Sequence, residues 1–570
     1  MSLTQVDKFL TNLITNKSRS WMIFLFTLSL TFAALYGFLG IQQGFSSQYV
    51  VQDDARQHLF WMQRFIDPDL FPNDLIADFY QSLAPGGYKT LYQLMSLVGV
   101  PPLVFSKFVP TILGVITAGY CFGVCLEIIS VPMAAFISSM LLSQNLWMQD
   151  TLISGTASSF LHPLLVAFLY YFIRKELLPM GIVIILFGLF YPTYVLICCG
   201  LLVLQLLRWD KGSIGFSKSK QDYIFSGVGL GIAFFVLLPY ALQASEFGPI
   251  ITAGEARKLP EFQPGARASF FHDHDPWRFW FNANRTGIRV TSALMPPLVY
   301  GGLLLPFLLG FSQYFPLVKE VSNKVVVLLQ LTGSSLTVFF IAHALIFRLF
   351  LPSRYTQHSL RIVLVLAAGI AVTLLLDAIL NWAKTISMGQ VLGIGLTICI
   401  VSVLIFYPFS LNKFPWTGYR VGTKSELYRF FSAQPKDILI SSLDDEISNI
   451  PTFSGRSILV GSEYALPYHV GYYSKIRQRI TDLIWAQYSY DREEIKDFVE
   501  KYGIDFWLLH KSAFEPEYLA NNRWLSQYQP ATKEAITSLK KETFPILANL
   551  INSCSVFESN DLVVIDTECI

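Results

Sequence analysis

The sequence predicts a polytopic α-helical membrane protein of about 11 transmembrane helices, followed by a small C-terminal α/β soluble domain. Of its 570 residues, 53% are hydrophobic and only 14% are charged, which is too apolar for an ordinary soluble protein. Apolar runs of membrane-spanning length recur up to about residue 410, and the composition then becomes that of a soluble domain. We therefore expect a transmembrane module at 1–410 with outer loops 41–104 and 244–290, and an extracytoplasmic domain at 411–570.

The first apolar run follows a basic amino end. Lys8, Lys17 and Arg19 precede the run Trp21 to Gly40, which is long enough to cross ~30 Å of hydrocarbon. No convincing small-residue cleavage site follows it. We expect a retained first helix with a cytoplasmic N-terminus.

Later apolar runs complete the expected bundle. The run 178–207 is too long for one span, and Pro192 interrupts it, so we expect two short helices there. An odd number of helices places the two ends of the chain on opposite sides. The runs fall near 105–127, 131–149, 157–173, 178–207, 223–243, 291–311, 325–347, 358–381 and 387–409.

Basic residues mostly follow the positive-inside tendency, with one exception. The outer loop 244–290 is rich in arginine. This excess indicates either an anion-binding function or a helix count that is wrong by one. Its basic residues are Arg257, Lys258, Arg267, Arg278, Arg285 and Arg289.

The C-terminal part alternates β-branched runs with helical stretches. Runs at 437–440, 457–460 and 504–509 indicate strands, and 491–502 indicates a helix. Cys554 and Cys569 form a disulfide if this part faces an oxidising compartment, and otherwise stay free. The other five cysteines lie in apolar runs, where thiols act as small hydrophobic groups.

An acidic pair, Asp53-Asp54, follows the first apolar run by about a dozen residues. Two adjacent carboxylates beside a bilayer suit proton transfer or a divalent cation. The segment 54–66 has apolar residues at helical spacing, so we expect an amphipathic helix along the outer membrane surface. The alternative is that an aspartate only caps this helix.

Further candidates lie near the outer helix ends. Asp150, after the third apolar run, provides another outward carboxylate, unless it only ends a helix. Arg348, Arg354 and Tyr355 lie between two later runs, where a guanidinium binds phosphate or only snorkels to the interface.

Metal and nucleic-acid binding have little support. His272, Asp273, His274 and Asp275 are possible metal ligands, but in an extended segment at most two of them point the same way. The net charge of +2 and the absence of a Lys/Arg block argue against nucleic acid. No Walker A, Gly-x-Ser-x-Gly, His-Glu-x-x-His or dinucleotide motif is present.

The layout resembles the GT-C superfamily of integral membrane glycosyltransferases, which use polyprenyl-phosphate-linked sugars. The features that carry the resemblance are the first helix, the outer loop that opens with Asp53-Asp54, the many further helices and the outer C-terminal domain. The segments 154–160 and 352–355 look like those of uncharacterised bacterial members.

The resemblance implies an inverting transfer of a sugar to an acceptor hydroxyl outside the cytoplasm. The expected location is the outer face of a bacterial plasma membrane. It assigns the general base to Asp54 or Asp53, with Asp150 and His58 assisting the acceptor or a metal. Arg354, and also Arg348 and Tyr355, would bind the donor phosphate. A divalent cation remains possible.

Two other functions fit parts of the sequence. A lipid or polysaccharide translocase for envelope assembly would spread polar groups along a path through the membrane, and a scaffold would bind a partner with its outer domain. A glycosyltransferase instead requires Asp53, Asp54 and Arg354 to converge on one outward cavity.

Overall fold

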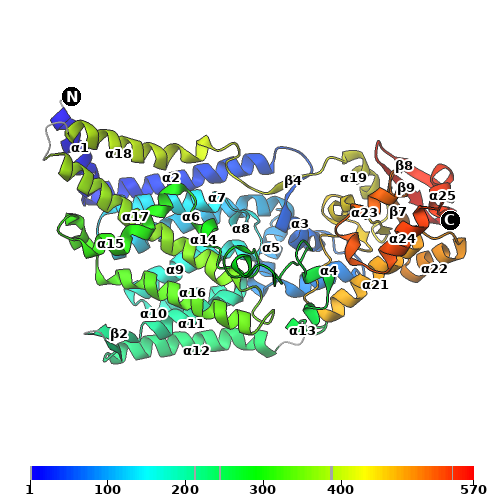
Figure 1. Ribbon diagram of the computed structural model, residues 1–570, viewed down its shortest axis with the longest axis horizontal. Helices are drawn as coiled ribbons and strands as arrows, with labels where there is room; N and C mark the ends of the chain where they lie inside the picture. Colours follow the sequence, from blue (N-terminus) through cyan, green and yellow to red (C-terminus); the bar gives the residue numbers. More distant parts are fainter. Residues whose placement is uncertain (1–2, 211–212, 243–244, 385–388, 542–543) are drawn as a thin grey trace.

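The structure is a computed structural model that describes residues 3–210, 213–242, 245–384, 389–541 and 544–570. A long helical bundle occupies one end of the molecule and the C-terminal domain the other, with the outer loops between them (Figure 1). The N-terminus lies at the free end of the bundle, far from the C-terminus. The ends of two expected apolar runs, at 243 and 387–388, lie outside the described residues.

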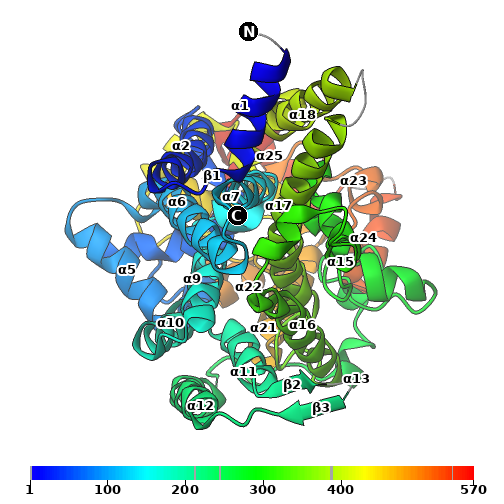
Figure 2. The same ribbon diagram turned by 90° about the vertical axis from the view of Figure 1, so that its left-hand side faces the viewer.

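The bundle confirms the expected class, a polytopic helical membrane protein. Within the described residues, seven helical segments are long and apolar enough to cross a membrane. Seen from the free end, α7 and α17 lie inside the bundle (Figure 2), and 72% of the apolar window of α17 is buried. The helices of the seven segments are α2 (Arg19–Gly44), α6 (Pro102–Ile128), α9 (Leu161–Arg174), α12 (Lys220–Leu242), α16 (Val326–Ala344), α17 (Ser353–Ala383) and α18 (Gly389–Phe406).

Shorter helices fill the remaining expected runs. The run 178–207 breaks as predicted, because α10 ends at Phe190 and a 3-10 turn over Pro192–Tyr194 leads into α11. The run 291–311 differs from expectation: Pro296 and Pro297 interrupt it, and only short helical pieces form. These shorter elements are α1 (Leu3–Thr15), α7 (Pro132–Trp147), α8 (Asp150–Ile153), α10 (Leu177–Phe190), α11 (Val195–Leu204), α13 (Ala253–Ala256), α14 (Val290–Ala293) and α15 (Leu305–Gly310), with the hairpin β2 (Leu207–Asp210) and β3 (Ser213–Phe216).

The first outer loop corrects one expectation. The expected surface helix 54–66 forms as the helix Asp53–Leu59 followed by a 3-10 turn, and its apolar side is interior up to Met62: Leu59, Phe60 and Met62 are at most 1% exposed, whereas Ile66 is 53% exposed. Phe60 packs edge-on against Tyr464 of the C-terminal domain at a centroid distance of 5.2 Å. Protein, not lipid, therefore covers its apolar face. The loop comprises β1 (Val50–Gln52), α3 (Asp53–Leu59), a 3-10 turn (Phe60–Phe65), α4 (Leu75–Leu83) and α5 (Gly86–Leu97).

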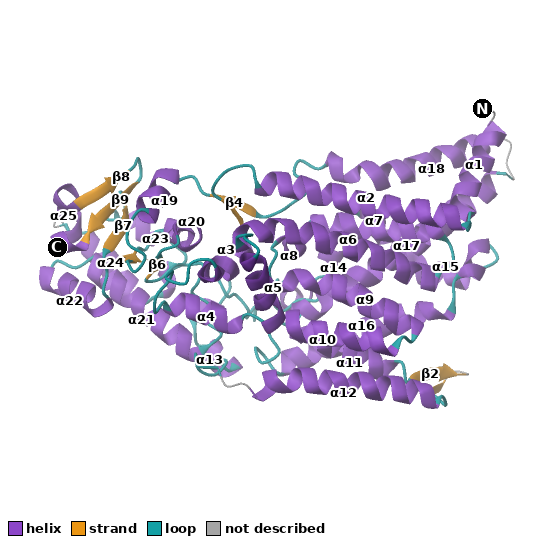
Figure 3. Ribbon diagram, turned by 180° about the vertical axis from the view of Figure 1, so that it is seen from behind, coloured by secondary structure: helices purple, strands orange, loops and turns teal. Residues whose placement is uncertain are grey.

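The C-terminal domain contains a five-stranded mixed sheet in the order β6-β5-β7-β9-β8 (Figure 3). β5 lies parallel to β6 and β7, and β9 is antiparallel to β7 and β8. The three expected strands and the 491–502 helix are present, whereas the edge formed by β8 and β9 was not expected. The domain comprises β4 (Tyr419–Val421), α19 (Ser425–Ser432), β5 (Leu439–Ser441), α20 (Ile450–Ser454), β6 (Ser457–Ile458), α21 (Val470–Gln487), α22 (Arg492–Tyr502), β7 (Phe506–His510), α23 (Pro516–Ala520), α24 (Ala531–Leu539), α25 (Ile546–Cys554), β8 (Ser555–Glu558) and β9 (Leu562–Asp566).

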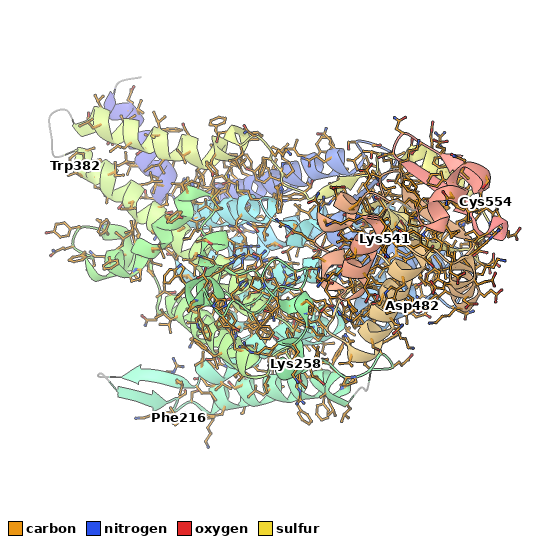
Figure 4. All side chains as sticks on the ribbon, turned by 45° about the vertical axis from the view of Figure 1, so that its right-hand side comes forward. Phe216, Lys258, Trp382, Asp482, Lys541 and Cys554 are labelled. Carbon is orange, nitrogen blue, oxygen red and sulfur yellow. A yellow bond between two sulfur atoms is a disulfide. The ribbon has the colours of Figure 1, made fainter. Side chains whose placement is uncertain are left out.

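Cys554 and Cys569 form a disulfide in this domain. Figure 4 shows Cys554 at the end of the molecule opposite Phe216 and Trp382, which mark the free end of the bundle. The bond ties the end of α25 to the end of the chain beyond β9. It thereby restrains the last part of the chain against the sheet.

Replacing both cysteines by serine should lower the stability of the C-terminal domain. A crosslink across a sequence separation of 15 residues stabilises by about 3 kcal/mol, mainly by restricting the unfolded chain. Denaturant unfolding of the full chain, followed by the fluorescence of its tryptophans, would measure the loss. Replacing the free, exposed Cys399 by serine is the control and should change little.

Candidate active site

A cavity of about 480 Å³ lies where the outer loops meet the start of α17. Asp54 of α3, Asp150 of α8 and Arg354 of α17 all line it. Arginines from the loop 244–290 and Trp416, which precedes the C-terminal domain, complete the wall. Residues far apart in sequence thus converge on one space.

A short strand pair positions the acidic pair. β1 pairs antiparallel with β4, and the backbone N–H of Asp53 donates to the carbonyl of Gly418 at 3.2 Å. The side chain of Gln52 caps α3 by accepting from the N–H of Ala55, so neither aspartate is the N-cap. Gly418 has a φ of +65°, and a Cβ there would lie 3.8 Å from the Cβ of Asp150. The segment around Gly418, which leads into the C-terminal domain, therefore lies between Asp53 and Asp150.

The two adjacent aspartates have different surroundings. Asp53 accepts hydrogen bonds from Arg56 at 3.0 Å and from two nitrogens of Arg420 at 3.1 Å each. Asp54 faces the cavity, and no salt bridge to it is present among the described residues. Burial and the nearby charge of Asp150 raise the pKa of Asp54 to about 6, although Arg354 opposes the shift. Asp54 is thus the member of the pair that is available for proton transfer.

Positive charge dominates the rest of the wall. Arginines outnumber aspartates five to two around the cavity. Burial and the charge of Arg354 lower the pKa of Arg289, although the charge of Asp150 opposes the shift. Such a wall is suited to an anionic ligand. The five are Arg267, Arg278, Arg285, Arg289 and Arg354.

One carboxylate of the C-terminal domain anchors the cavity. Glu463 accepts from Arg267 at 2.8 Å and from Arg56 of α3 at 2.8 Å, and all three side chains are less than one-third exposed. Its backbone carbonyl accepts from Gln57 and from Arg267, each at 2.6 Å. Three separate parts of the chain therefore meet at Glu463.

A buried polar layer lies on α17, the helix that also carries Arg354. His358 and Arg361 follow Arg354 by four and seven residues, so the three share one helix face. Arg361 is fully buried, and its Nη1 lies 3.4 Å from Nε2 of His162 on α9. Arg361 was not among the residues predicted from the sequence, although its helical spacing from Arg354 would have indicated it.

Four residues proposed from the sequence do not line the cavity. Asp53 is engaged as described above, and Arg348 is exposed. The ring of His58 packs edge-on against Tyr80, and burial lowers the pKa of His58 to about 4. The hydroxyl of Tyr355 donates to the carbonyl of Leu349 at 2.7 Å. Asp53, His58 and Tyr355 therefore contact the surrounding protein rather than the cavity.

The four candidate metal ligands of the loop do not gather. His272 lines the cavity, but Asp273 pairs with Arg257 at 2.6 Å and Asp275 accepts from the backbone N–H of Arg278. Within the described ranges, no group of three or more histidine, cysteine or acidic side chains is arranged to hold a metal. The cluster at 272–275 therefore has no support as a metal site.

The fold and the cavity define a polytopic helical membrane protein with a polar, arginine-rich cavity at one end of its bundle. The sequence matches no protein-family model and no curated protein.

The structure is similar to that of the oligosaccharyltransferase AglB from Archaeoglobus fulgidus. With the form tethered to an acceptor peptide, the TM-score is 0.55 at 11% identity, over 91% of this chain and 72% of that chain. With the complex of an inhibitory peptide and a dolichol-phosphate, it is 0.56 at 11% identity, over 90% and 72%. With the apo form it is 0.51 at 12% identity, over 90% and 72%.

Replacing Glu463 by glutamine should loosen the C-terminal domain from the cavity wall. The change leaves the partly buried Arg56 and Arg267 without their shared carboxylate, so we expect a loss of about 2 to 3 kcal/mol. Thermal unfolding and limited proteolysis of the purified protein would measure it. Glu558→Gln, which breaks the exposed pair with Lys511, is the matched control and should change stability by less than about 1 kcal/mol. Equal effects of the two variants would contradict the anchoring role.

Proposed function

We propose that this protein is a glycosyltransferase that moves a sugar from a polyprenyl-phosphate-linked donor to an acceptor hydroxyl. The observation that supports this most directly is that Asp54 and Arg354 line the same cavity, at the end of the membrane bundle. A base and a phosphate-binding cation must act on one substrate complex, which requires such proximity. The similar fold of an archaeal oligosaccharyltransferase, solved with a dolichol-phosphate, adds support.

In the proposed reaction, Asp54 accepts the proton of the acceptor hydroxyl as its oxygen bonds to the anomeric carbon. The bond from that carbon to the phosphate oxygen breaks, and the lipid phosphate leaves with the bonding electrons. Arg354 and Arg289 stabilise the negative charge that develops on it. Inversion follows from attack opposite the leaving group. A base with a pKa near 6 is ionised at neutral pH and still basic enough to assist.

We place the cavity on the extracytoplasmic face of a plasma membrane, with the N-terminus in the cytoplasm. Arg208 lies on β2, which is at the end of the bundle away from the C-terminal domain (Figure 1), and Lys175 pairs with Asp222 as Arg208 does, in agreement with the positive-inside tendency. The Cys554–Cys569 disulfide favours an oxidising compartment for that domain.

A divalent cation would be held by Asp150, beside Asp54, together with the phosphate of the donor. Both aspartates line the cavity, and the negative charge of Asp150 raises the pKa of Asp54. Magnesium is commonly bound by one or two carboxylates together with substrate phosphates, so the donor set fits. When bound, the cation would supply positive charge to the phosphate.

Asp54→Asn should reduce sugar transfer by about 10²- to 10⁴-fold, because the general base is lost. Transfer of labelled sugar from a polyprenyl-phosphate donor to endogenous acceptors measures this. Asp69→Asn, in the same outer loop but with an exposed side chain outside the cavity, is the matched control and should remain active. A fully active Asp54→Asn variant would remove Asp54 from the mechanism. A translocase would show no labelled product even in the wild type.

The rate of transfer should depend on the ionisation of Asp54. Because the deprotonated carboxylate is the base, kcat/KM should fall as the pH drops below about 6 and level off above it. Asp150→Asn removes a negative neighbour, so the pKa of Asp54 should fall and the acid limb should move to lower pH. A pH profile of kcat/KM for both proteins tests this. An acid limb at the same pH in Asp150→Asn as in the wild type would contradict the electrostatic coupling of Asp54 and Asp150.

A further inference from the structure

The cavity holds more positive charge than one phosphate requires. In the proposed function, Arg354 and its neighbour Arg289 meet the donor phosphate, and a lipid-linked sugar monophosphate carries a single negative charge. Arg278 and Arg285 also line the cavity and have no role in that reaction. Asp54 and Asp150 offset two of the four guanidinium charges that lack a salt bridge among the described residues, and the two that remain exceed the single charge of the donor phosphate. This arrangement favours a ligand with more than one anionic group.

The fifth arginine is already neutralised. Arg267 forms its salt bridge with Glu463 and donates to the same residue's carbonyl. Arg278 and Arg285, by contrast, form no salt bridge in the part of the chain that the structure describes; the pair at 2.6 Å in this loop belongs to Arg257 and Asp273. The unassigned positive charge therefore belongs to Arg278 and Arg285.

Arg285 is held in a fixed position beside the donor end. Its carbonyl accepts from the backbone N–H of Ser353, the residue before Arg354, at 3.2 Å. The hydroxyl of Ser353 also donates to the carbonyl of Asn284 at 2.7 Å. The guanidinium of Arg285 donates one N–H to the carbonyl of Arg267 at 2.6 Å, which leaves its other donors for a ligand. A fixed guanidinium loses little entropy on binding an oxyanion.

We propose that Arg278 and Arg285 form a second anion subsite, which binds a phosphate or carboxylate group in addition to the donor phosphate at Arg354. The proposal rests on the proposed function, because it takes the Arg354 end as the donor site. The second anion is either the second phosphate of a diphosphate-linked donor or an acidic group on the acceptor. Both offer two oxygens that can accept parallel N–H bonds from one guanidinium.

Binding to the purified full-length protein tests the subsite without any transfer reaction. Farnesyl phosphate and farnesyl diphosphate differ only in the second phosphate, and calorimetry gives their affinities. Glucuronate and glucose, titrated onto protein saturated with farnesyl phosphate, differ in the carboxylate. We expect the wild type to prefer the more acidic member of at least one pair by about tenfold, and Arg285→Gln to abolish that preference.

Control variants distinguish loss of the subsite from a general loss of positive charge and from failure to fold. Arg257→Gln removes an arginine of the same loop that pairs with Asp273 and lies outside the cavity, so its affinities should match the wild type. Arg278→Gln changes an exposed side chain and should weaken the preference even if Arg285→Gln fails to fold. Asp54→Asn should reduce transfer by about 10²- to 10⁴-fold yet keep the preference, which distinguishes failure of the proposed function from failure of the subsite.

Each outcome decides the proposal. If the wild type prefers farnesyl diphosphate and Arg285→Gln does not, the second anion is the second phosphate of the donor. If the wild type prefers glucuronate and Arg285→Gln does not, the second anion is an acidic group on the acceptor. A wild type without either preference, or Arg278→Gln and Arg285→Gln variants with wild-type affinities for all four probes, would overturn it.

Discussion

The contacts of Glu463 with Arg56 and Arg267 are the interaction on which the arrangement of the cavity depends. Arg56 belongs to the helix that carries Asp54, Arg267 belongs to the arginine-rich loop, and Glu463 belongs to the C-terminal domain. None of these parts is adjacent in sequence. Because each side chain is partly shielded from water, the pairs are screened less than surface salt bridges. The soluble domain is therefore a structural part of the site wall, not an appendage to the membrane bundle.

The same network explains how two adjacent aspartates come to differ. Arg56 joins Asp53 to Glu463, and Arg420 holds Asp53 through two nitrogens, so this carboxylate is fully engaged. Asp54, one residue later on the helix, points to the cavity and meets Asp150 instead. Basic side chains pair with Asp53, whereas burial and then the like charge of Asp150 raise the pKa of Asp54. The surroundings, rather than residue type, make Asp54 the better proposed base.

The sequence predicts what depends on local pattern. Apolar length identifies the bundle, Pro192 marks a true break, and the runs at 437–440, 457–460 and 504–509 each contain a strand. It fails where tertiary packing decides: the helix at Asp53 has an apolar face that fits a membrane surface equally well, yet Tyr464 and other protein groups cover it. Glu463 carries no local signal at all, since its role exists only once Arg56 and Arg267 are brought together. The arginine excess at 244–290 was visible, but its location around Asp54 required the fold.

That arginine excess has a physical reason within the membrane setting. In the proposed topology, the arginine-rich loop 244–290 lies on the outer side, against the positive-inside tendency. The arginine excess is tolerated because three carboxylates, those of Asp54, Asp150 and Glu463, offset part of its positive charge. On α17, buried Arg361 meets His162 and no carboxylate lies within salt-bridge distance among the described residues, so the positive field continues behind the cavity. A buried guanidinium without a counter-ion is unfavourable in isolation. Arg361 lies seven residues after Arg354, on the same helix face. An anion bound in the cavity would stabilise both Arg354 in the wall and Arg361 behind it, which accounts for this placement.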